Sequence, residues 1–236
     1  MAPPRFALAE GITHPDGSAP PGPQCVEGKV APRLPVLLLS ESGSETCRGT
    51  TEGEAMETET GWACTVMKLE EPCARGWMVA VIGARKGVYR RLDARTVTDP
   101  GRLEAYRAAI GAAGVAEAAS ARGHESKALA ADERIEPSVA SAVVFPGLPG
   151  KLGFVRLRAT GNASGLGPWV VFEGGKPATV IGPIALARLT AFTLDGAAFV
   201  YAQRAGCTEC GAVSSEIYAV EGGRLRRVFE SAFGSN

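Results

Sequence analysis

The stretch that decides the fold begins Ser141-Ala-Val-Val-Phe145 and continues through Phe154-Val-Arg-Leu-Arg158, Trp169-Val-Val-Phe172, Glu173-Gly-Gly-Lys176 and Thr179-Val-Ile181. Each apolar run has the length of a β-strand and is rich in β-branched or aromatic residues. The Gly-Gly pair suits a two-residue hairpin turn, because both central residues of such a turn need positive φ. The stretch therefore predicts four short strands joined by turns.

A second copy of this pattern closes the chain. It reads Leu189-Thr-Ala-Phe192, Phe199-Val-Tyr-Ala-Gln203, Ile217-Tyr-Ala-Val220, Glu221-Gly-Gly-Arg224 and Arg227-Val-Phe229. The Glu-Gly-Gly-basic motif recurs at an offset of 48 residues and Phe-Val at an offset of 45. A repeat of this kind predicts one supersecondary unit used twice.

Strand-like segments at 35–40, 62–69, 77–82 and 88–92 suggest a third, more diverged copy. We therefore predict a mainly β fold with antiparallel sheets built from repeated four-stranded units, at 34–93, 140–182 and 187–230. A sandwich, a barrel and a propeller-like ring all stay open. The units are expected to form a single β-rich domain over residues 33–236.

One helix is predicted between the first unit and the repeated pair, near residues 100–122 within an insert at 99–123. Asp99 suits the N-cap, Pro100 the first helical position and Gly123 the end. An apolar stripe formed by Leu103, Tyr106, Ile110 and Ala113 is expected to face the sheet.

Two polar regions flank the first strand. Residues 1–32 include a Pro/Gly-rich run and predict a poorly ordered tether. Residues 41–60, with six glutamates, predict a long solvated loop, because their acids lack the spacing of a calcium loop.

The composition argues against two classes of partner. Lysine plus arginine equals aspartate plus glutamate, at 25 each, so no charge excess favours a nucleic acid. The longest aliphatic run, at 36–39, is far shorter than a transmembrane helix.

The first ten residues do not resemble a signal peptide, so the chain is either cytosolic as written or a form from which a signal was removed.

Six cysteines favour oxidised pairs and an exported protein, periplasmic or extracellular. Cys207 and Cys210, as Cys-x-x-Cys-Gly between two strand-like segments, are expected to bond to each other. A zinc knuckle and a redox pair are the alternatives, but the first needs more ligands and the second a helix. The remaining four cysteines can pair in three ways, and we expect them to have a structural role: Cys25, Cys47, Cys64 and Cys73.

The sequence nominates no catalytic, cofactor-binding or metal-binding residue. Only His14 and His124 could serve as an imidazole base, and no Gly-x-Ser-x-Gly elbow accompanies them. Several carboxylates could act in pairs, but nothing selects two as partners: Glu70, Glu71, Asp93 and Asp195.

These observations predict a non-enzymatic exported binding or structural module, a component of a cell envelope or extracellular assembly. Its partner is expected to be another protein or an envelope component. The alternatives are a carboxylate-dependent hydrolase and a zinc-stabilised cytosolic adaptor.

Overall fold

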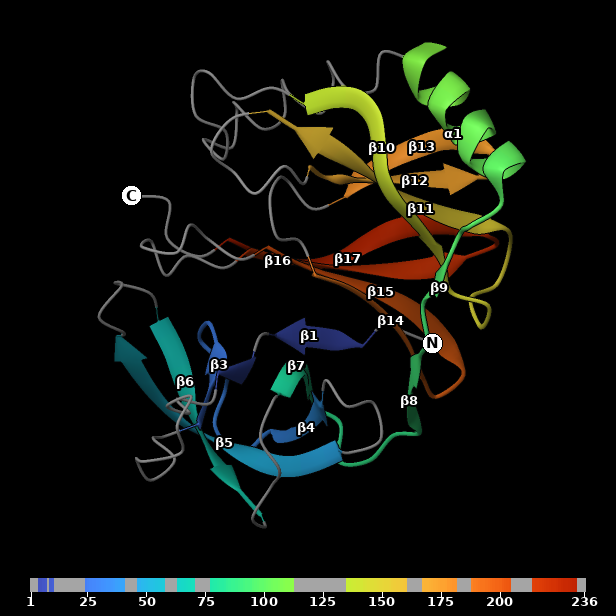
Figure 1. The fold of residues 1–236 in the computed structure, drawn as a ribbon. Coiled ribbons are helices and arrows are strands. Elements are labelled where there is room, and N and C mark those ends of the chain that lie inside the picture. The colour runs from blue at the N-terminus through green and yellow to red at the C-terminus, as the bar shows by residue number, and fades with distance from the viewer. Residues whose placement is uncertain are drawn as a thin grey trace, which may run out of the picture. The chain divides into compact units, whose positions relative to one another are not determined.

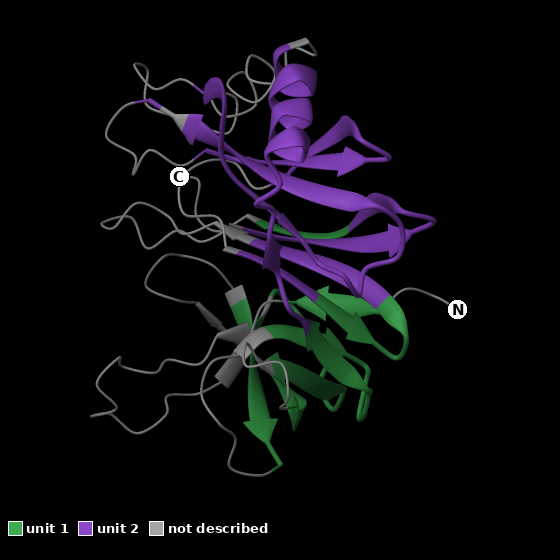
Figure 2. Cartoon of the chain, turned by 45° about the vertical axis from the view of Figure 1, so that its right-hand side comes forward, with its two compact units in different colours: residues 1–91, 192–197, 228–236 green, residues 92–191, 198–227 purple. Residues whose placement is uncertain are grey.

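The computed structural model describes residues 4–7, 9–10, 24–40, 46–57, 63–70, 77–112, 135–160, 167–181, 188–204 and 214–232. Within these residues the protein is mainly β, with antiparallel sheets and one α-helix, as the repeats predict. The chain divides into two compact units, where the sequence predicts one domain (Figure 2). Unit 1 comprises residues 1–91, 192–197 and 228–236, and unit 2 comprises residues 92–191 and 198–227.

Unit 1 contains one seven-stranded sheet. Its strands are Arg5–Ala7 (β1), Ala9–Glu10 (β2), Gln24–Glu27 (β3), Pro35–Ser40 (β4), Thr46–Glu57 (β5), Ala63–Leu69 (β6) and Trp77–Ile82 (β7). They lie in the order β1-β7-β4-β5-β6-β3-β2. β1 and β2 are consecutive in the chain yet stand at opposite edges of this order, so the sheet curls back toward itself.

Residues 1–32, where the sequence predicts a poorly ordered tether, contain three of these strands. β1 pairs with β7 and β3 pairs with β6, and the side chains of Phe6 and Val26 are buried. These strands are only two to four residues long, and their pairing partners are distant in sequence. Local pattern therefore does not reveal them. The Pro/Gly-rich run itself, within residues 11–23, lies outside the described residues.

β5 occupies most of the polar stretch 41–60, so the prediction of a solvated loop there is wrong. Buried residues alternate with exposed or half-buried ones along the strand, at Cys47, Gly49 and Thr51. This is the period of two that a half-buried strand requires. The inward positions carry small side chains, so hydrophobicity does not mark them.

The strand order of unit 1 differs from a third copy of the repeat. β7 lies beside β4, and β5 and β6 follow on the other side, which is the 4-1-2-3 order of a Greek key. The segment that the sequence assigns as the fourth strand of this unit, β8 (Tyr89–Leu92), pairs in another sheet. Because the sequence does not mark β5 as a strand, β8 was counted as the fourth strand of this unit in place of β7.

The two C-terminal copies each form a four-stranded meander. The first comprises Ile135–Val144 (β10), Leu152–Ala159 (β11), Trp169–Glu173 (β12) and Lys176–Ile181 (β13). The second comprises Arg188–Leu194 (β14), Ala197–Arg204 (β15), Ser214–Glu221 (β16) and Arg224–Ala232 (β17). A short upstream strand lies beside the first strand of each copy, β9 (Arg95–Thr96) next to β10 and β8 next to β14. The internal repeat is thus also a repeat of topology.

Both Gly-Gly pairs form the turns that the sequence predicts. Gly174 and Gly175 have φ of 58° and 87°, and Gly222 and Gly223 have φ of 58° and 79°. These values suit a two-residue hairpin turn in which both central residues have positive φ.

The glutamate before each Gly-Gly pair has a different partner. Glu173 accepts a hydrogen bond from the N–H of Leu225 at 3.1 Å, which ties the turn of the first copy to the last strand of the second. Glu221 instead accepts hydrogen bonds from the exposed Arg226. These bonds hold the pKa of the Glu221 carboxyl below its ordinary value.

Unit 2 is layered as helix, sheet and sheet, a sandwich-like arrangement (Figure 1). Apolar side chains from both copies fill the space between the sheets, among them Phe154, Val171, Ile181, Val200 and Tyr218. On the other face of the first sheet, α1 (Pro100–Ala112) packs against Val155, Val170 and Phe172. Strand β12 is buried on both faces of this sheet, which explains why residues 169–172 are apolar throughout instead of alternating.

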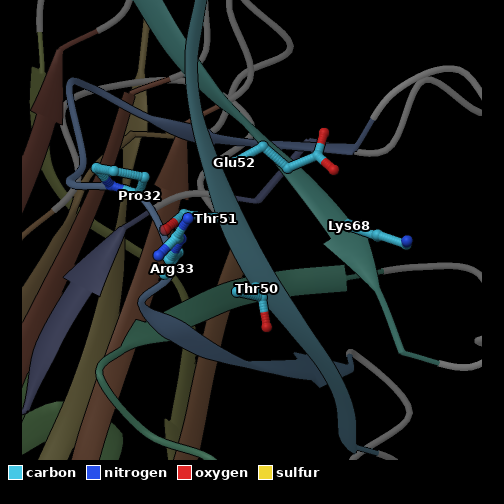
Figure 3. Close-up of a pocket in the computed structure, with 6 residues that line it drawn as sticks. All are labelled: Pro32, Arg33, Thr50, Thr51, Glu52 and Lys68. Carbon is cyan, nitrogen blue, oxygen red and sulfur yellow. The ribbon is translucent and has the colours of Figure 1, made fainter.

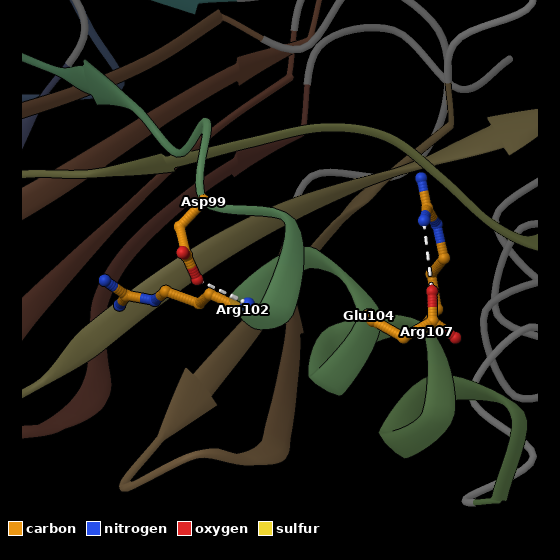
Figure 4. A network of polar contacts seen from close by, with 4 residues as sticks. All are labelled: Asp99, Arg102, Glu104 and Arg107. Atoms are coloured by element: carbon orange, nitrogen blue, oxygen red, sulfur yellow. Dashed lines mark hydrogen bonds and ion pairs between the residues drawn. The ribbon is translucent and has the colours of Figure 1, made fainter.

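The start of α1 follows the sequence prediction. Asp99 Oδ1 accepts a hydrogen bond from the N–H of Arg102 at 2.6 Å, as an N-cap should (Figure 4). Glu104 and Arg107 form an exposed ion pair at 3.2 Å (Figure 4). The predicted C-terminal part of the helix, residues 113–122, lies outside the described residues.

Gly153 is required by the packing of α1 on the sheet. A Cβ atom at this position would clash with the hydroxyl oxygen of Tyr106. Tyr106 is buried and its ring packs on Phe172 with centroids 4.5 Å apart, so it cannot move freely. We predict that Gly153→Ala lowers the free energy of unfolding by about 1–3 kcal/mol, measured by urea denaturation.

Two variants serve as controls for this prediction. Gly111→Ala on α1 places its methyl group where no atom lies within 4 Å, and it should stabilise the protein by up to about 1 kcal/mol. Tyr106→Phe removes the hydroxyl and should reduce the cost of Gly153→Ala. An equal cost in both backgrounds would show that the hydroxyl is not what requires glycine.

Candidate functional site

The sequence predicts that all six cysteines form disulfides, and the structure describes the side chains of two of them. Cys47 in β5 and Cys64 in β6 are both disulfide-bonded, with 2% and 1% of their surface exposed. Cys25 lies in β3. The remaining three lie outside the described residues: Cys73, Cys207 and Cys210. The Cys207–Cys210 bond therefore stays a prediction.

The strand register shows that Cys47 and Cys64 belong to different disulfides. Gly49 lies opposite Leu69, and Met56 lies opposite Cys64. Cys47 is therefore level with a point beyond the end of β6, about 23 Å from Cys64 at a rise of about 3.3 Å per residue. A disulfide joins Cα atoms that are usually no more than about 6.8 Å apart.

Chain length excludes Cys73 as the partner of Cys64. The N–H of Glu70 donates to the carbonyl oxygen of Arg48 at 2.9 Å, so the extended course of β6 continues to residue 70. Glu70 is about 20 Å from Cys64 by strand rise. Three further residues can span at most about 11 Å, which leaves a gap too long for a disulfide.

Cys25 stands closer to Cys64 than to Cys47. It lies opposite Val66, and the cross-strand partner of Cys64 is Glu27, two residues away. Cys25 and Cys64 are therefore diagonal neighbours on adjacent strands. Cys47, by contrast, lies about 15 Å from Cys25 when measured along the strand direction alone. If Cys207 bonds to Cys210, as the sequence predicts, we predict Cys25–Cys64 and Cys47–Cys73 as the other two pairs.

This connectivity predicts a specific set of tryptic peptides, because trypsin separates the four N-terminal cysteines. Without reduction, mass spectrometry should find residues 6–29 linked to 49–68, residues 34–48 linked to 69–75, and residues 205–224 carrying an internal bond. Reduction should release every peptide. A link between 34–48 and 49–68, or between 49–68 and 69–75, would contradict the register argument.

The side chains considered for catalysis do not gather in one place among the described residues. Asp195 binds the N–H of Val88, Glu70 pairs with Arg48 at 3.9 Å, and Asp93 is exposed. Outside the described residues lie His14, Glu71 and His124. In the part of the chain that the structure describes, no three His, Cys, Asp or Glu side chains cluster as metal ligands would.

Buried polar side chains of unit 2 pair with one another. Glu216, 5% exposed, accepts hydrogen bonds from the hydroxyl of Tyr218 at 2.9 Å and from Arg227 Nη1 at 3.1 Å. The charge of Glu216 is thereby satisfied. The guanidinium of Arg156 lies over the ring of Trp169 at 5.6 Å, and burial lowers its pKa from the ordinary value. Arg156 Nε donates to the carbonyl oxygen of Gly167 at 3.2 Å, but its buried Nη2 has no hydrogen-bond partner among the described residues.

Residues 83–91, which we call the basic segment, have a backbone fixed at several points. The N–H of Gly83 donates to the carbonyl oxygen of Pro35 at 2.7 Å. The N–H of Val88 donates to Asp195 Oδ1 at 2.8 Å, and its carbonyl oxygen accepts from the N–H of Asp195 at 3.0 Å. Tyr89 packs edge-on against Phe192. An irregular segment is thereby held in one conformation.

The basic segment presents cations around an exposed apolar side chain. Val88 is 76% exposed, the one large hydrophobic side chain so exposed among the described residues. Arg85, Lys86, Arg90 and Arg91 are also exposed, and the segment contains no acid. The chain as a whole carries equal numbers of basic and acidic residues, so its composition does not reveal this local excess.

A second surface feature of unit 1 is a cavity of about 570 Å³ beside β5 and β6. Lys68 extends from β6, Thr50 and Glu52 from β5, and Pro32 and Arg33 from a turn beside them (Figure 3). Thr50 and Lys68 are cross-strand partners. The cavity thus combines two cations, one carboxylate and a hydroxyl.

Two buried threonines hold the residues that lead into this cavity. Thr51 Oγ1 accepts from the N–H of Leu34 at 3.0 Å and donates to the carbonyl oxygen of Ala31 at 2.6 Å. Thr65 Oγ1 accepts from the N–H of Val30 at 2.9 Å and donates to the carbonyl oxygen of Gly28 at 2.7 Å. Each hydroxyl bridges two backbone groups of the turns at 28–34.

Sequence reasoning missed most of these residues. Asp195-Gly196 is a hairpin-turn signature, with φ of 51° and 82°, and could have been recognised, but Asp195 was considered only as an acid. Thr51 and Thr65 act on residues 17 to 37 positions away, which no local pattern reveals.

Comparisons with known proteins do not place this chain. No family model, curated protein or solved structure matches it. Among the described residues, no helix is long and apolar enough to cross a membrane.

Proposed function

We propose that this chain is an exported, non-enzymatic binding module of a cell envelope or extracellular assembly, and that its basic segment holds an acidic protein partner. The observation that carries the proposal is Val88, which is 76% exposed although Asp195 binds both its N–H and its carbonyl oxygen. A fixed apolar side chain loses little conformational entropy when it enters a pocket on a partner.

The charges around Val88 support an acidic partner. Arg85, Lys86, Arg90 and Arg91 are exposed, so they would meet carboxylates at the rim of the interface. Complementary rim charges accelerate association and disfavour basic competitors. Exposed pairs contribute little affinity individually, so the apolar contact is expected to dominate the free energy of binding.

The cysteines support export. Disulfides persist in oxidising compartments such as the periplasm and the extracellular space. Cys47 and Cys64 are disulfide-bonded and buried. A zinc-stabilised adaptor would need such thiols as free thiolate ligands.

Site-specific photo-cross-linking in the native host tests the proposal. A photoreactive residue in place of Val88 should form an adduct whose partner peptide is rich in Asp and Glu. Reversing Arg85, Lys86 and Arg90 to glutamate should lower the yield about tenfold or more, because charge complementarity governs encounter. Asp195→Ala should also lower the yield, since it leaves the cations in place but removes the carboxylate that accepts from the N–H of Val88.

The matched control places the photoreactive residue at Glu104, an exposed position on α1. A yield at Val88 no higher than at Glu104 would refute the proposed interface. So would an adduct that persists unchanged after the charge reversal.

A further inference from the structure

The cavity beside β5 and β6 is shaped by features that a simple hairpin would not need. The register of β5 against β6 shifts between Thr51 and Ala55, where four steps along β5 match two along β6. This bulge includes Gly53, with φ of 82°, where a Cβ would lie 2.7 Å from the Cβ of Pro32. Glycine therefore lets the turn approach the bulged strand. Bulges of this kind often re-aim side chains next to functional sites.

Arg33 adopts a backbone conformation that favours glycine. Its φ is 63°, and it follows Pro32 in the turn. A non-glycine residue in this region is disfavoured by about 1 kcal/mol or more. The turn tolerates Arg33 because its N–H donates to the carbonyl oxygen of Thr51 at 2.7 Å. A cation is thus held at the cavity at a position where glycine would be the less strained choice.

The side chains of the cavity define a ligand chemistry. The guanidinium of Arg33 can bind a carboxylate or phosphate through two parallel hydrogen bonds, and Lys68 adds a second cation. Glu52 is an acceptor when ionised, so it requires a donor such as a hydroxyl group, and Thr50 can donate or accept. The volume of about 570 Å³ lies within the range of small-molecule sites, and the cavity is open to solvent because most of its lining side chains are exposed.

We propose that this cavity binds an acidic saccharide, with the anionic group on the guanidinium of Arg33, Lys68 as a second cation on the far side of β5, and the sugar hydroxyls on Glu52 and Thr50 (Figure 3). The residues differ from those of the basic segment, so this site does not depend on the proposed protein partner. A uronate carboxylate and a sugar phosphate share the chemistry that the two cations recognise. Comparing the dissociation constants of a uronate and of a sugar phosphate identifies which of these two anionic groups the cavity binds.

Titration of the full chain tests the proposal, with binding followed by calorimetry. Glucuronate and glucose 6-phosphate are the probes, and glucose and glutamate are the comparison ligands. At least one of the two acidic sugars should bind, and more tightly than both glucose and glutamate. Arg33→Gly should weaken that binding about tenfold or more, as expected for the loss of a charged bidentate contact.

Arg33→Gly also separates binding from folding. Glycine suits the positive φ at this position, so the thermal midpoint should stay the same or rise. Arg107→Gln on α1 removes an exposed cation far from these residues in sequence and should leave binding unchanged.

Three outcomes would overturn the site. One is the absence of binding by either acidic sugar up to about 20 mM, where even a ligand with a millimolar dissociation constant would saturate. The second is that glucose or glutamate binds as tightly as the acidic sugars. The third is that Arg33→Gly leaves the binding of the acidic sugars unchanged.

Discussion

The hydroxyl groups of two buried threonines hold the turns at residues 28–34, and the cavity of unit 1 depends on them. Thr51 and Thr65 are each 1% exposed, and each bridges an N–H and a carbonyl oxygen of the turn backbone. Buried backbone groups need partners, and here strand side chains supply them. Because β5 and β6 satisfy the turns, Arg33 can occupy a backbone region that is unfavourable for its side chain.

The basic segment follows the same principle. Asp195, in the β14–β15 turn, binds both backbone polar groups of Val88 and so fixes an irregular segment from outside. In each case a residue outside the irregular segment supplies the hydrogen bonds that its backbone lacks, through threonine side chains on strands for the turns and through the side chain and backbone N–H of Asp195 for Val88. Binding groups held in this way are preorganised, which reduces the entropy lost when a ligand or partner is bound.

The sequence predicted features that depend on local chemistry. The Gly-Gly hairpins, the Asp99 cap and the burial of Tyr106 and Ile110 follow from turn geometry and helical period. β5 was missed because its inward residues are small, and the N-terminal strands because they are short. The cavity could not be predicted, since nothing local marks Arg33 for positive φ or selects Thr51 as its support.

The most direct measurement of the central claim is amide hydrogen exchange in Thr51→Val and Thr65→Val, which keep side-chain shape but remove the hydroxyl. Thr51→Val should lower the protection of the Leu34 amide by about 1–3 kcal/mol while that of Val30 is largely retained, and Thr65→Val should do the reverse. If both amides keep their wild-type protection in both variants, the hydroxyls do not hold the turns and the account of the cavity fails.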